Sequence, residues 1–480
     1  MTGILLIIVF LVMVALMYSR KMAALLALPV MAVLFAIIAR VPSEDILNVV
    51  LKDGALRLHE ACIVAVFGGM LAIFVKEKGI AETFIKYAAE LSGDRPQIVC
   101  FIIMAASALL FTTLGGLGAI IMVGSIVLPI LLSLGTPPLI TAGIFLIGLC
   151  AGGTLNPVGW QLYIDTLKVE KDVVVNFAVI LTGIYFLIGT FLIIWGTRDP
   201  RSSVQKTFIL FAKLILCIIV IGGLCYLGRV PLMSFFGKIN SFWTGKGVGN
   251  TEGIAYGNYI LLVLGGFCVL RITYGIFTKN NSLALSLLTP IIPIILVLFA
   301  GWEFIPAFIA ALIWGLFSTW DRNSLRVFPK AMIEGAESVI PAVLLMLGIG
   351  MLLKSVTHPN VSAELQPLLV KVIPSTPWGY VFAFTVMAPL ALYRGPLNIW
   401  GMGLGLAGLM KQTGFLTGGA LMGALMSVGA IQGVCDPTNT HNVWIANFLG
   451  VDVVAVTRKL LPYIWVLAFL GLLVGSMKYF

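Results

Sequence analysis

Long apolar runs separated by short polar segments make up most of this chain. Twelve runs are long enough to cross about 30 Å of hydrocarbon as a helix. They lie at about residues 3–18, 22–40, 58–75, 139–160, 174–196, 207–228, 258–278, 283–300, 304–320, 338–354, 416–440 and 460–477. Because a helix satisfies its own backbone groups in lipid, the pattern predicts an all-α, polytopic membrane protein with about 12 transmembrane helices.

Two further apolar segments, at about 97–133 and 377–411, are interrupted near their middles. Small residues interrupt the first at 114–118 (Leu-Gly-Gly-Leu-Gly), and a charge and a proline interrupt the second at 393–396 (Tyr-Arg-Gly-Pro). We interpret each as a re-entrant hairpin whose tip stops inside the protein. Two ordinary spans joined by a tight turn are the alternative for each segment.

The chain matches itself at one fixed offset, which carries position 156 onto position 436 and which we call the repeat offset. Asn156-Pro157 pairs in this way with Asp436-Pro437. The repeat offset also pairs glycines and one acidic tripeptide: Gly68 with Gly348, Gly115 with Gly395, Gly143 with Gly423, Gly153 with Gly433, and Asp172-Val173-Val174 with Asp452-Val453-Val454. These matches carry weight because glycine and proline each meet a backbone demand that other residues do not.

The repeat divides the chain into two units and a linker. Residues 1–196 form the first unit, with a hairpin at about 97–133 and a span broken at 153–160. Residues 283–480 form the second, with a hairpin at about 377–411 and a span broken at 433–441. Residues 197–282 supply two linking helices and an outer loop. Seven crossings separate equivalent points, so the second unit is expected to be upside-down, as in secondary transporters.

The composition agrees with a membrane protein and narrows its chemistry. The chain is 60% hydrophobic and 10% charged, whereas a soluble domain is about a quarter charged. Its net charge of +10 comes from basic residues in short loops, so no nucleic-acid partner is expected. The seven cysteines lack metal spacing, and three histidines make a His-based metal or haem site improbable. With no Walker loop, no cofactor is expected beyond a coupling ion, H⁺ or Na⁺.

The distribution of Lys and Arg orients the chain in its membrane. If the N-terminus faces out, the inner loops collect more basic residues than the outer ones, among them Lys76, Lys78, Arg322 and Arg326. Both termini are therefore expected outside a bacterial cytoplasmic (inner) membrane. Residues 1–18 show no basic leader and no small-residue cleavage site, so we interpret them as a retained first span.

Arg394 is the sharpest candidate for ligand binding. It lies beside Gly395 in a segment that is otherwise free of charge from residue 372 to 410. An arginine within a membrane segment is costly and usually marks a ligand or an ion pair, and its planar fork suits a carboxylate. An ion pair with Asp436, or a plain aqueous turn, are the alternatives.

Each unit also has a span broken at a proline, at 154–157 (Thr-Leu-Asn-Pro) and 435–440 (Cys-Asp-Pro-Thr-Asn-Thr). Proline leaves the carbonyl four residues earlier without its helical donor. The freed backbone groups are then available to a cation or to an anionic substrate group, as are the side chains of Asn156, Thr438, Asn439 and Thr440. A proline kink satisfied by neighbouring helices is the structural alternative.

The two breaks differ chemically, since Asp436 stands where the first unit has Asn156. This carboxylate is a candidate to take up a proton, to bind Na⁺ or to neutralise Arg394. His441 either shares the proton or bonds a backbone carbonyl. Trp160 and Gln161 follow the first break and either line the cavity or, for the aromatic ring, anchor at the interface. Asp165 and Lys168 are expected at the aqueous end.

The whole pattern resembles the ion transporter superfamily, which includes dicarboxylate, citrate and gluconate permeases. The resemblance implies a homodimer in which a transport domain moves against a fixed scaffold, as an elevator, coupled to Na⁺ or H⁺. Carried over, the site comprises the tips at Gly115-Gly116 and Arg394-Gly395 and the breaks at Asn156-Pro157 and Asp436 to Thr440 (Thr438, Asn439 and Thr440 among them). Our own interpretation of the residues adds Trp160, Gln161, Asn398 and His441 as candidates, and places a candidate Na⁺ site near Gly115, Asn156, Asp436 and Asn439. The dicarboxylate members carry Ser-Asn-Thr at both tips. Here only residues 438–440 (Thr-Asn-Thr), on the second break, are similar.

The sequence therefore predicts a secondary transporter for a small organic anion, such as a carboxylate or a sugar acid. A cation/proton antiporter that exchanges through Asp436 is the alternative within transport. An integral membrane enzyme using Asp436 and His441 is less well supported, because Asn156 offers no second acid or nucleophile. A channel is the remaining class, and the sequence does not name the substrate.

Overall fold

A computed structural model describes most of the chain outside the linker. The described residues are 2–18, 21–91, 95–198, 209, 211–216, 283–369, 373–374, 376–395, 397–399, 403–412 and 414–480. The expected linker at 197–282, with its crossings at 207–228 and 258–278, therefore lies almost entirely outside the described residues.

Helices account for all the regular structure of the described residues. The first part of the chain holds α1 (Thr2–Tyr18), α2 (Ala24–Ile38), α3 (Ser43–Asp45), the π-helix η1 (Ile46–Asp53), α4 (Gly54–Leu56), α5 (His59–Glu77), α6 (Ile80–Leu91), α7 (Pro96–Phe111), α8 (Gly116–Ser133), α9 (Pro138–Thr154), α10 (Pro157–Leu167) and α11 (Lys171–Gly196). After the linker come α14 (Leu283–Ser286), α15 (Ile292–Ala300), α16 (Phe304–Ser318), α17 (Ser324–Thr357), α18 (Pro359–Leu369), α19 (Pro377–Met387), the 3₁₀-helix η2 (Ala388–Arg394), α20 (Gly403–Gln412), α21 (Gly418–Cys435), α22 (Thr440–Phe448) and α23 (Val453–Tyr479).

Six helices among the described residues are long and apolar enough to cross a membrane, or seven if the bent pair α9–α10 counts as one span. The six are Ser43–Glu77, Gly116–Ser133, Lys171–Gly196, Ser324–Thr357, Gly418–Phe448 and Val453–Tyr479. The chain is thus an integral, multi-pass membrane protein, and the count of twelve crossings stays a prediction. One expected span, 283–300, is instead two short helices, α14 and α15, because Pro290 and Pro293 do not continue a helix from α14.

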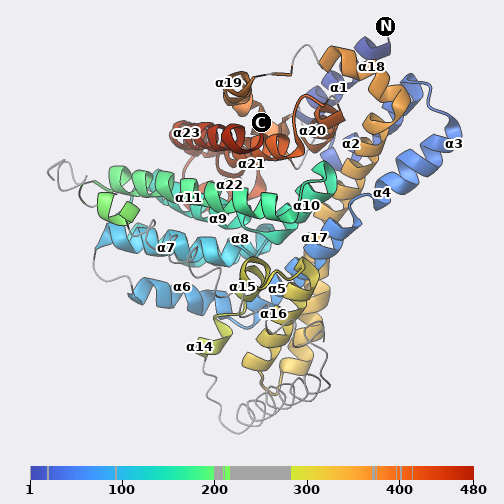
Figure 1. The fold of residues 1–480 in the computed structure, drawn as a ribbon. Helices are drawn as coiled ribbons and strands as arrows, with labels where there is room; N and C mark the ends of the chain where they lie inside the picture. The colour runs from blue at the N-terminus through green and yellow to red at the C-terminus, as the bar shows by residue number, and fades with distance from the viewer. Residues whose placement is uncertain are drawn as a thin grey trace, which may run out of the picture.

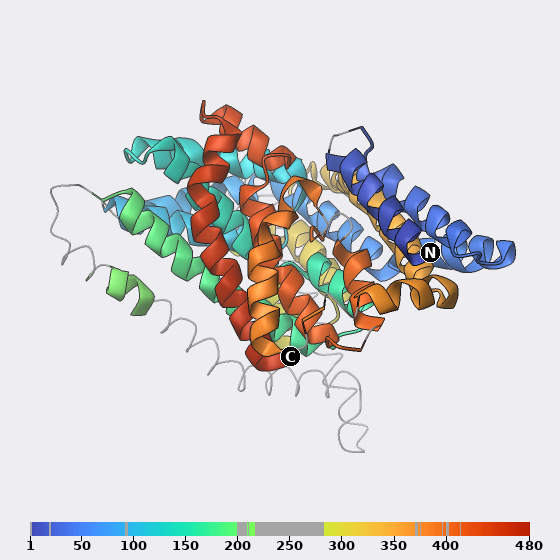
Figure 2. The ribbon, with the colours of Figure 1, turned by 90° about the horizontal axis from the view of Figure 1, so that it is seen from above.

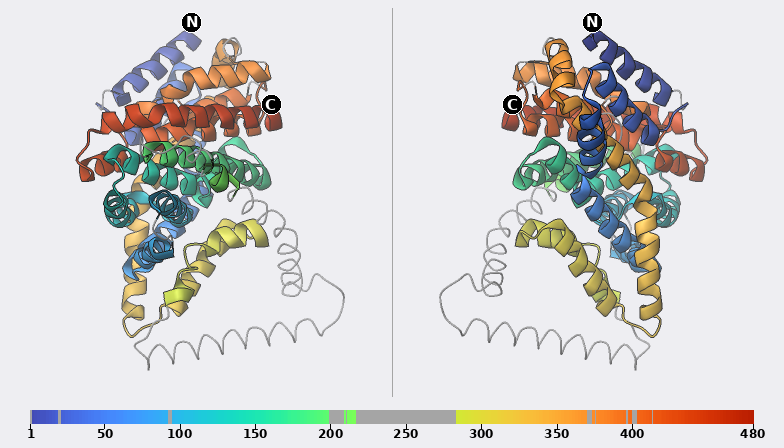
Figure 3. Two further views of the ribbon diagram at one scale, coloured as in Figure 1. Left: turned by 90° about the vertical axis from the view of Figure 1, so that its left-hand side faces the viewer. Right: turned by 90° about the vertical axis from the view of Figure 1, so that its right-hand side faces the viewer.

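The helices form two groups that run in different directions (Figure 1). In the first group, which we call the stack, α7, α9, α11, α21 and α23 lie side by side. In the second, the frame, α17 crosses the end of the stack steeply and packs against α2 and α5, while α1 packs on α2 and α16 on α5. Seen from above, the blue N-terminal helices lie on the opposite side of the molecule from green α11 (Figure 2). Both chain ends lie in the upper half of each view of Figure 3.

Glycines allow α17 to touch α4 and α5 backbone to backbone within the frame. A Cβ on Gly69 would lie 2.4 Å from the carbonyl oxygen of Gly335, and one on Gly350 would lie 2.2 Å from that of Gly54. Neither position accepts a larger residue unless a helix moves. Small residues commonly permit such close crossings in membranes, where no hydrophobic effect drives helices together.

Helix bounds recur at the repeat offset. Adding this offset to both bounds of α2 gives the bounds of α16, and adding it to the first residue of α9 gives the first residue of α21. Contacts recur as well. A Cβ on Gly68 would lie 3.7 Å from Phe308, and a Cβ on Gly348 would lie 3.3 Å from Leu28. Gly68 and Gly348 are one repeat offset apart, and so are Leu28 and Phe308, so each contact is the counterpart of the other.

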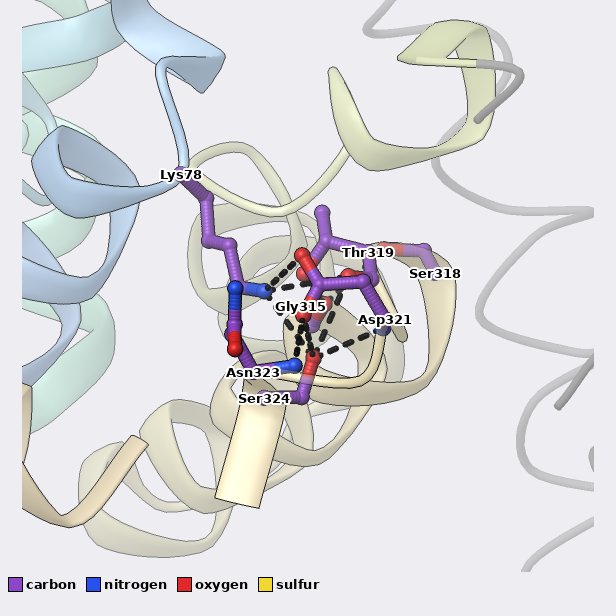
Figure 4. Close-up of polar contacts among 7 residues, drawn as sticks. All are labelled: Lys78, Gly315, Ser318, Thr319, Asp321, Asn323 and Ser324. Carbon is purple, nitrogen blue, oxygen red and sulfur yellow. Dashed lines mark hydrogen bonds and ion pairs between the residues drawn. The ribbon is translucent and has the colours of Figure 1, made fainter. Parts of the chain in front are cut away.

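Lys78 ties the end of α5 to the turn between α16 and α17 (Figure 4). Its ammonium donates to the carbonyl of Thr319 at 3.1 Å, to Asp321 Oδ2 at 3.1 Å and to Ser324 Oγ at 2.9 Å. Partial burial raises the pKa of Asp321, but the hydrogen bond and charge of Lys78 outweigh it, with help from Ser324 and the N–H of Asn323. The pKa of Asp321 consequently lies below its ordinary value.

The equivalent end of α17 carries a similar contact. His358 stands one repeat offset after Lys78, and its Nε2 lies 3.5 Å from Asp45 Oδ2. This contact is an ion pair only while the imidazole is protonated. Each long frame helix therefore ends in a basic residue that holds an acidic residue next to a neighbouring helix.

Candidate functional site

The two proline breaks lie beside each other in the stack. Helices α9 and α21 pack together, and a Cβ on Gly433 would lie 2.6 Å from the sulfur of Cys150. Just before the first break, a Cβ on Gly152 would lie 2.2 Å from the carbonyl oxygen of Ala108 on α7. Helix α21 likewise packs on η2. The fold thus brings both breaks together, each beside an interrupted apolar segment, or hairpin, of its own unit. Helix α8 by itself is long and apolar enough to cross a membrane, and the re-entrant form of these segments stays a prediction.

The first break is a bend that is less buried than the second. Helices α9 and α10 meet at 52°, and Gly153 is exposed while Thr154 to Asn156 are half-buried. The carbonyl of Thr154 accepts the indole N–H of Trp160 at 2.8 Å. Asn156 Oδ1 accepts the N–H of Val158 at 2.9 Å and so caps α10, a common use of Asn before Pro at the first helical position.

Asp436 makes a similar local hydrogen bond at the second break. Its Oδ1 accepts the N–H of Thr438 at 2.8 Å and the hydroxyl of Thr438 at 2.6 Å. The carboxylate is fully buried. Both side chains thus accept the N–H two residues ahead, but Asn156 caps a helix that begins at once, whereas Asp436 closes a turn before α22 begins at Thr440.

Side chains that follow the second break satisfy the carbonyls that end α21. Pro437 has no N–H for the carbonyl of Gly433, and His441 Nε2 lies 3.0 Å from that oxygen, so the ring donates through Nε2. The amide of Asn439 donates to Gln432 at 2.7 Å. Of the two uses foreseen for His441, bonding a backbone carbonyl is the one seen.

Two residues that the sequence did not single out complete this arrangement. Asn442 Nδ2 donates to the carbonyls of Asp436 at 2.8 Å and Val434 at 3.3 Å, and Thr457 Oγ1 donates to the carbonyl of Cys435 at 2.7 Å. Asn442 was within reach of sequence reasoning, since it follows the same polar stretch. Thr457 was not, because it lies in α23 and only the packing of α23 on α21 brings it there.

The tip of the first hairpin is open. Gly115 and Gly116 are exposed, and a Cβ on either would meet nothing within 4 Å. Gly116 has φ of +80°, a left-handed conformation that glycine adopts at no steric cost. Beside the tip, Thr113 Oγ1 donates to the carbonyl of Pro290 at 2.9 Å. An open glycine tip permits close backbone approach by a ligand.

The tip of the second hairpin is tighter. A Cβ on Gly395 would lie 1.9 Å from the carbonyl oxygen of Leu390, and the preceding Tyr393 has φ of +56°. Asn398 is 1% exposed and its amide lies 3.5 Å from the carbonyl of Ala391. The backbone of Arg394 ends η2, while its guanidinium lies outside the described part of the structure, so its ligand role stays a prediction.

Two predicted site residues face away from the second break. The fully buried ring of Trp160 packs on Phe304 of the frame, with ring centroids 6.0 Å apart, and so is not an interfacial anchor. Gln161 lies between two carboxylates, those of Glu60 and Asp165. Asp165 is only 8% exposed, which corrects the expectation that it lies at the aqueous end; Lys168 is exposed as expected.

The acidic and metal-binding side chains do not gather at the breaks. Within the described residues no group of three or more His, Cys, Asp or Glu is placed to hold a metal. A Na⁺ ion near Asn156, Asp436 or Asn439 would instead depend on amide, hydroxyl and carbonyl oxygens. One such oxygen is Asn442 Oδ1, which is buried with no hydrogen-bond partner among the described residues.

An all-helical chain with two adjacent broken helices beside hairpin segments has the architecture of a secondary transporter. Two solved transporter structures share this fold. The Alcanivorax borkumensis YdaH transporter superposes with a TM-score of 0.54 and 13% identity over 99% of this chain and 97% of its own. MtrF of Neisseria gonorrhoeae, described as illuminating a class of antimetabolite efflux pumps, superposes with a TM-score of 0.50 and 12% identity over 93% and 84%.

These likenesses show the fold and nothing finer. No protein-family model matches the chain, and no curated protein matches it in sequence. The neighbours are transporters and not enzymes. Membership of the ion transporter superfamily is not confirmed by these comparisons.

Proposed function

We propose that this protein is a secondary active transporter that moves a small organic anion across the bacterial cytoplasmic membrane. The observation that carries the proposal is the side-by-side packing of two helices broken at equivalent X-Pro positions. Broken backbone is tolerated at membrane depth only where protein or a wet cavity satisfies it. Two such breaks in contact make a site at which a substrate and a coupling ion can meet.

The open first tip and the bent first break are the proposed substrate side of this site. Gly115 and Gly116 leave room for close backbone approach, and Gly153 is exposed while residues 154–156 are half-buried. Arg394 supplies the positive charge that a carboxylate or sugar acid requires. Asn398, Thr438, Asn439 and Thr440 are proposed to complete the polar surroundings of the substrate.

Coupling is proposed at the second break, where Asp436 is buried. A proton or Na⁺ that neutralises this carboxylate lowers the cost of keeping it out of water. Among the described oxygens, Asn442 Oδ1 is free to join such a site. In this proposal the coupling ion binds in the second unit, which carries the charged Asp436.

The proposed mechanism is of the elevator type, in a homodimer. The stack holds both breaks, whereas the frame is built on backbone-close crossings of α5 and α17. A rigid frame and a separate stack are the parts that such a motion needs. The two units are proposed to be inverted repeats, which the recurrence of helix bounds and glycine contacts at the repeat offset supports.

The proposal is tested by purified protein in two assays. A thermal-shift screen of carboxylates, sugar acids and antimetabolite anions, each with and without Na⁺, should single out one class of ligand. Proteoliposomes should then accumulate that ligand when a gradient of H⁺ or Na⁺ across the membrane drives its uptake. No stabilisation by any anion, together with no anion uptake under either gradient, would count against the proposal.

A cation/proton antiporter is the second candidate, and the complete burial of Asp436 favours it. Such a protein would exchange Na⁺ or another cation for protons with no anion present. Proteoliposomes loaded with a pH indicator distinguish the two functions. A cation-driven pH change in the absence of any organic anion supports the antiporter, and its absence supports the anion carrier.

A further inference from the structure

A pair of acidic residues joins α5 of the frame to α10, about two turns beyond the first break. Gln161 Nε2 donates to Glu60 Oε2 at 2.6 Å and to Asp165 Oδ1 at 3.1 Å. Glu60 is exposed, whereas Asp165 is 8% exposed. One neutral amide group thus serves two carboxylates that belong to different helices.

The other oxygen of Asp165 has no hydrogen bond of good geometry. Asp165 Oδ2 is buried and unpaired among the described residues, although the backbone N–H of Ala61 also faces this carboxylate. An ionised oxygen in this position would be costly, because burial of a charge requires a partner. The second carboxylate adds repulsion, since two acids sharing a site do not ionise together readily. The two carboxylates would therefore be stabilised by a positive charge, which the surrounding side chains do not fully supply.

The charged and titratable neighbours on each packed element bear this out. Glu60 on α5 opposes ionisation of Asp165, and Lys168, which follows α10, favours it from an exposed position. Cys62 on α5 also lies within electrostatic range. On α20, Lys411 instead donates to the carbonyl of Leu167. Among the described groups of α11 and α21, Tyr185 and Cys435 interact with Cys150 and not with Asp165.

We propose that Asp165 is a proton-binding site of this transporter and that Glu60 exchanges its proton with water. This proposal rests on the proposed transport function and adds a site distinct from Asp436. In the loaded state the pair carries one proton and a net charge of −1. In the emptied state the O–H bond has broken, the proton has gone to water, and the pair carries −2.

The position of the pair gives this proton a mechanical consequence. Glu60 belongs to the frame, while α10 packs on α5 and also on α11, α20 and α21. In the loaded state Gln161 holds the two acids together across this boundary. In the emptied state they repel each other across it, so protonation favours one position of α10 against α5.

The donor set favours a proton over a metal ion. Gln161 presents its nitrogen, and not its oxygen, to both carboxylates, which leaves few oxygens facing the site. Hard cations such as Na⁺ require several oxygen ligands, whereas a proton requires one. We therefore expect no dependence of this site on Na⁺.

Infrared difference spectroscopy on the purified full-length protein, without any substrate, tests the proposal. The wild type should lose a protonated carboxylic acid band as the pH rises, and Asp165→Asn should lack that band. Asp172→Asn, an exposed aspartate at the start of α11, is the matched control and should keep it. The same band in Asp165→Asn, or its removal from the wild type by Na⁺ at constant pH, would overturn the proposal.

A second variant covers the case in which Asp165→Asn does not fold. Glu60→Gln changes an exposed residue and removes the opposing charge, so the midpoint of the band should move to lower pH. An unchanged midpoint would overturn the proposal. Because neither measurement requires transport, a failure to find an anion substrate leaves this test intact.

Transport then gives an independent reading once a substrate is known. In proteoliposomes Asp165→Asn should retain exchange of labelled for unlabelled substrate but lose at least about ten-fold of the uptake driven by a proton gradient. Asp172→Asn should retain both. Full proton-driven uptake by Asp165→Asn would contradict the coupling role.

Discussion

The two proline breaks begin from matching sequence and end as different structures. The first bends by 52° and leaves residues 153–156 exposed or half-buried. The second runs within one apolar span, Gly418–Phe448, whose most apolar 18 residues are 78% buried. Asn439, His441 and Thr457 donate to the carbonyls of the second break, whereas Thr154 and Trp160 donate to carbonyls at the first.

This difference shows that a stretch rich in polar side chains is not necessarily a ligand-binding site. Residues 433–443 are rich in side chains with chemistry, yet most of those side chains bond the backbone of the break itself. The first break is poorer in polar residues and less buried, with Gly153 exposed and residues 154–156 half-buried. We therefore expect ligand contact chiefly at the first break and the tips, and the coupling charge at the second.

The largest effect should come from removing the only charge of the second tip. Because loss of one partner of a charge pair in a dry site costs roughly 3–5 kcal/mol, Arg394→Ala should reduce anion uptake into proteoliposomes by more than about 100-fold. Arg394→Lys should recover little, since an ammonium lacks the planar fork. Arg95→Ala, an exposed arginine before the first hairpin, is the control and should transport normally. Undiminished uptake by Arg394→Ala would contradict the proposal that Arg394 binds the substrate anion.

Exchanging Asp436 and Asn156 tests the charge difference between the breaks directly. Asp436→Asn keeps an oxygen that can accept the N–H and hydroxyl of Thr438, so the free energy of unfolding should change by only about 1 kcal/mol. Gradient-driven uptake should nevertheless fall by about ten-fold or more. The reciprocal Asn156→Asp should disturb coupling less. If Asp436→Asn kept full gradient-driven uptake, coupling would have to lie elsewhere, and the Asp165 site would be the next candidate.

His441 tests whether the second break is held closed by its own side chains. His441→Ala leaves the carbonyl of Gly433 without its donor, which should cost about 1–3 kcal/mol of stability and lower the melting temperature of the purified protein. Thr440→Ala, at an exposed neighbouring position, should change it little. An unchanged melting temperature for His441→Ala would mean that another group can cover this carbonyl.

The sequence predicted the framework because long apolar runs and prolines each act locally. The all-helical membrane class, the breaks at Pro157 and Pro437 and the interruptions at 114–118 and 393–396 appear in the structure at the expected places. The roles of Trp160 and Asp165 could not be predicted in this way. Both depend on which helix faces α10, and that is decided by packing against α5 and α16.

The same limit explains what was missed at the second break. Residue type alone marked His441 and Asn439 as candidate ligands, while their bonds to Gly433 and Gln432 follow from the path of the chain after Pro437. Thr457 looked like an ordinary polar residue at the start of an apolar run. The sequence shows which polar groups need hydrogen-bond partners, but only the folded structure shows which of them are already hydrogen-bonded within the protein.

The smallest expected effect concerns stability, and it distinguishes the contact of Lys78 with Asp321 from that of His358 with Asp45. The pKa of Asp321 is lowered in the folded state, so its pairing with Lys78 stabilises the fold above the ordinary carboxyl pKa, and this contribution is lost as the pH falls through the lowered value. Asp321 is 41% exposed, so the effect should be modest and weaker in high salt.

Melting temperatures measured at decreasing pH check this difference between the two contacts. Asp321→Asn should lower stability near neutral pH and flatten its fall in acid. Asp45→Asn should lower stability near neutral pH less than Asp321→Asn does, because the contact of Asp45 with His358 is an ion pair only while the imidazole is protonated. Equal losses of stability in the two variants at neutral pH would show that the two ends contribute alike, in spite of their different basic residues.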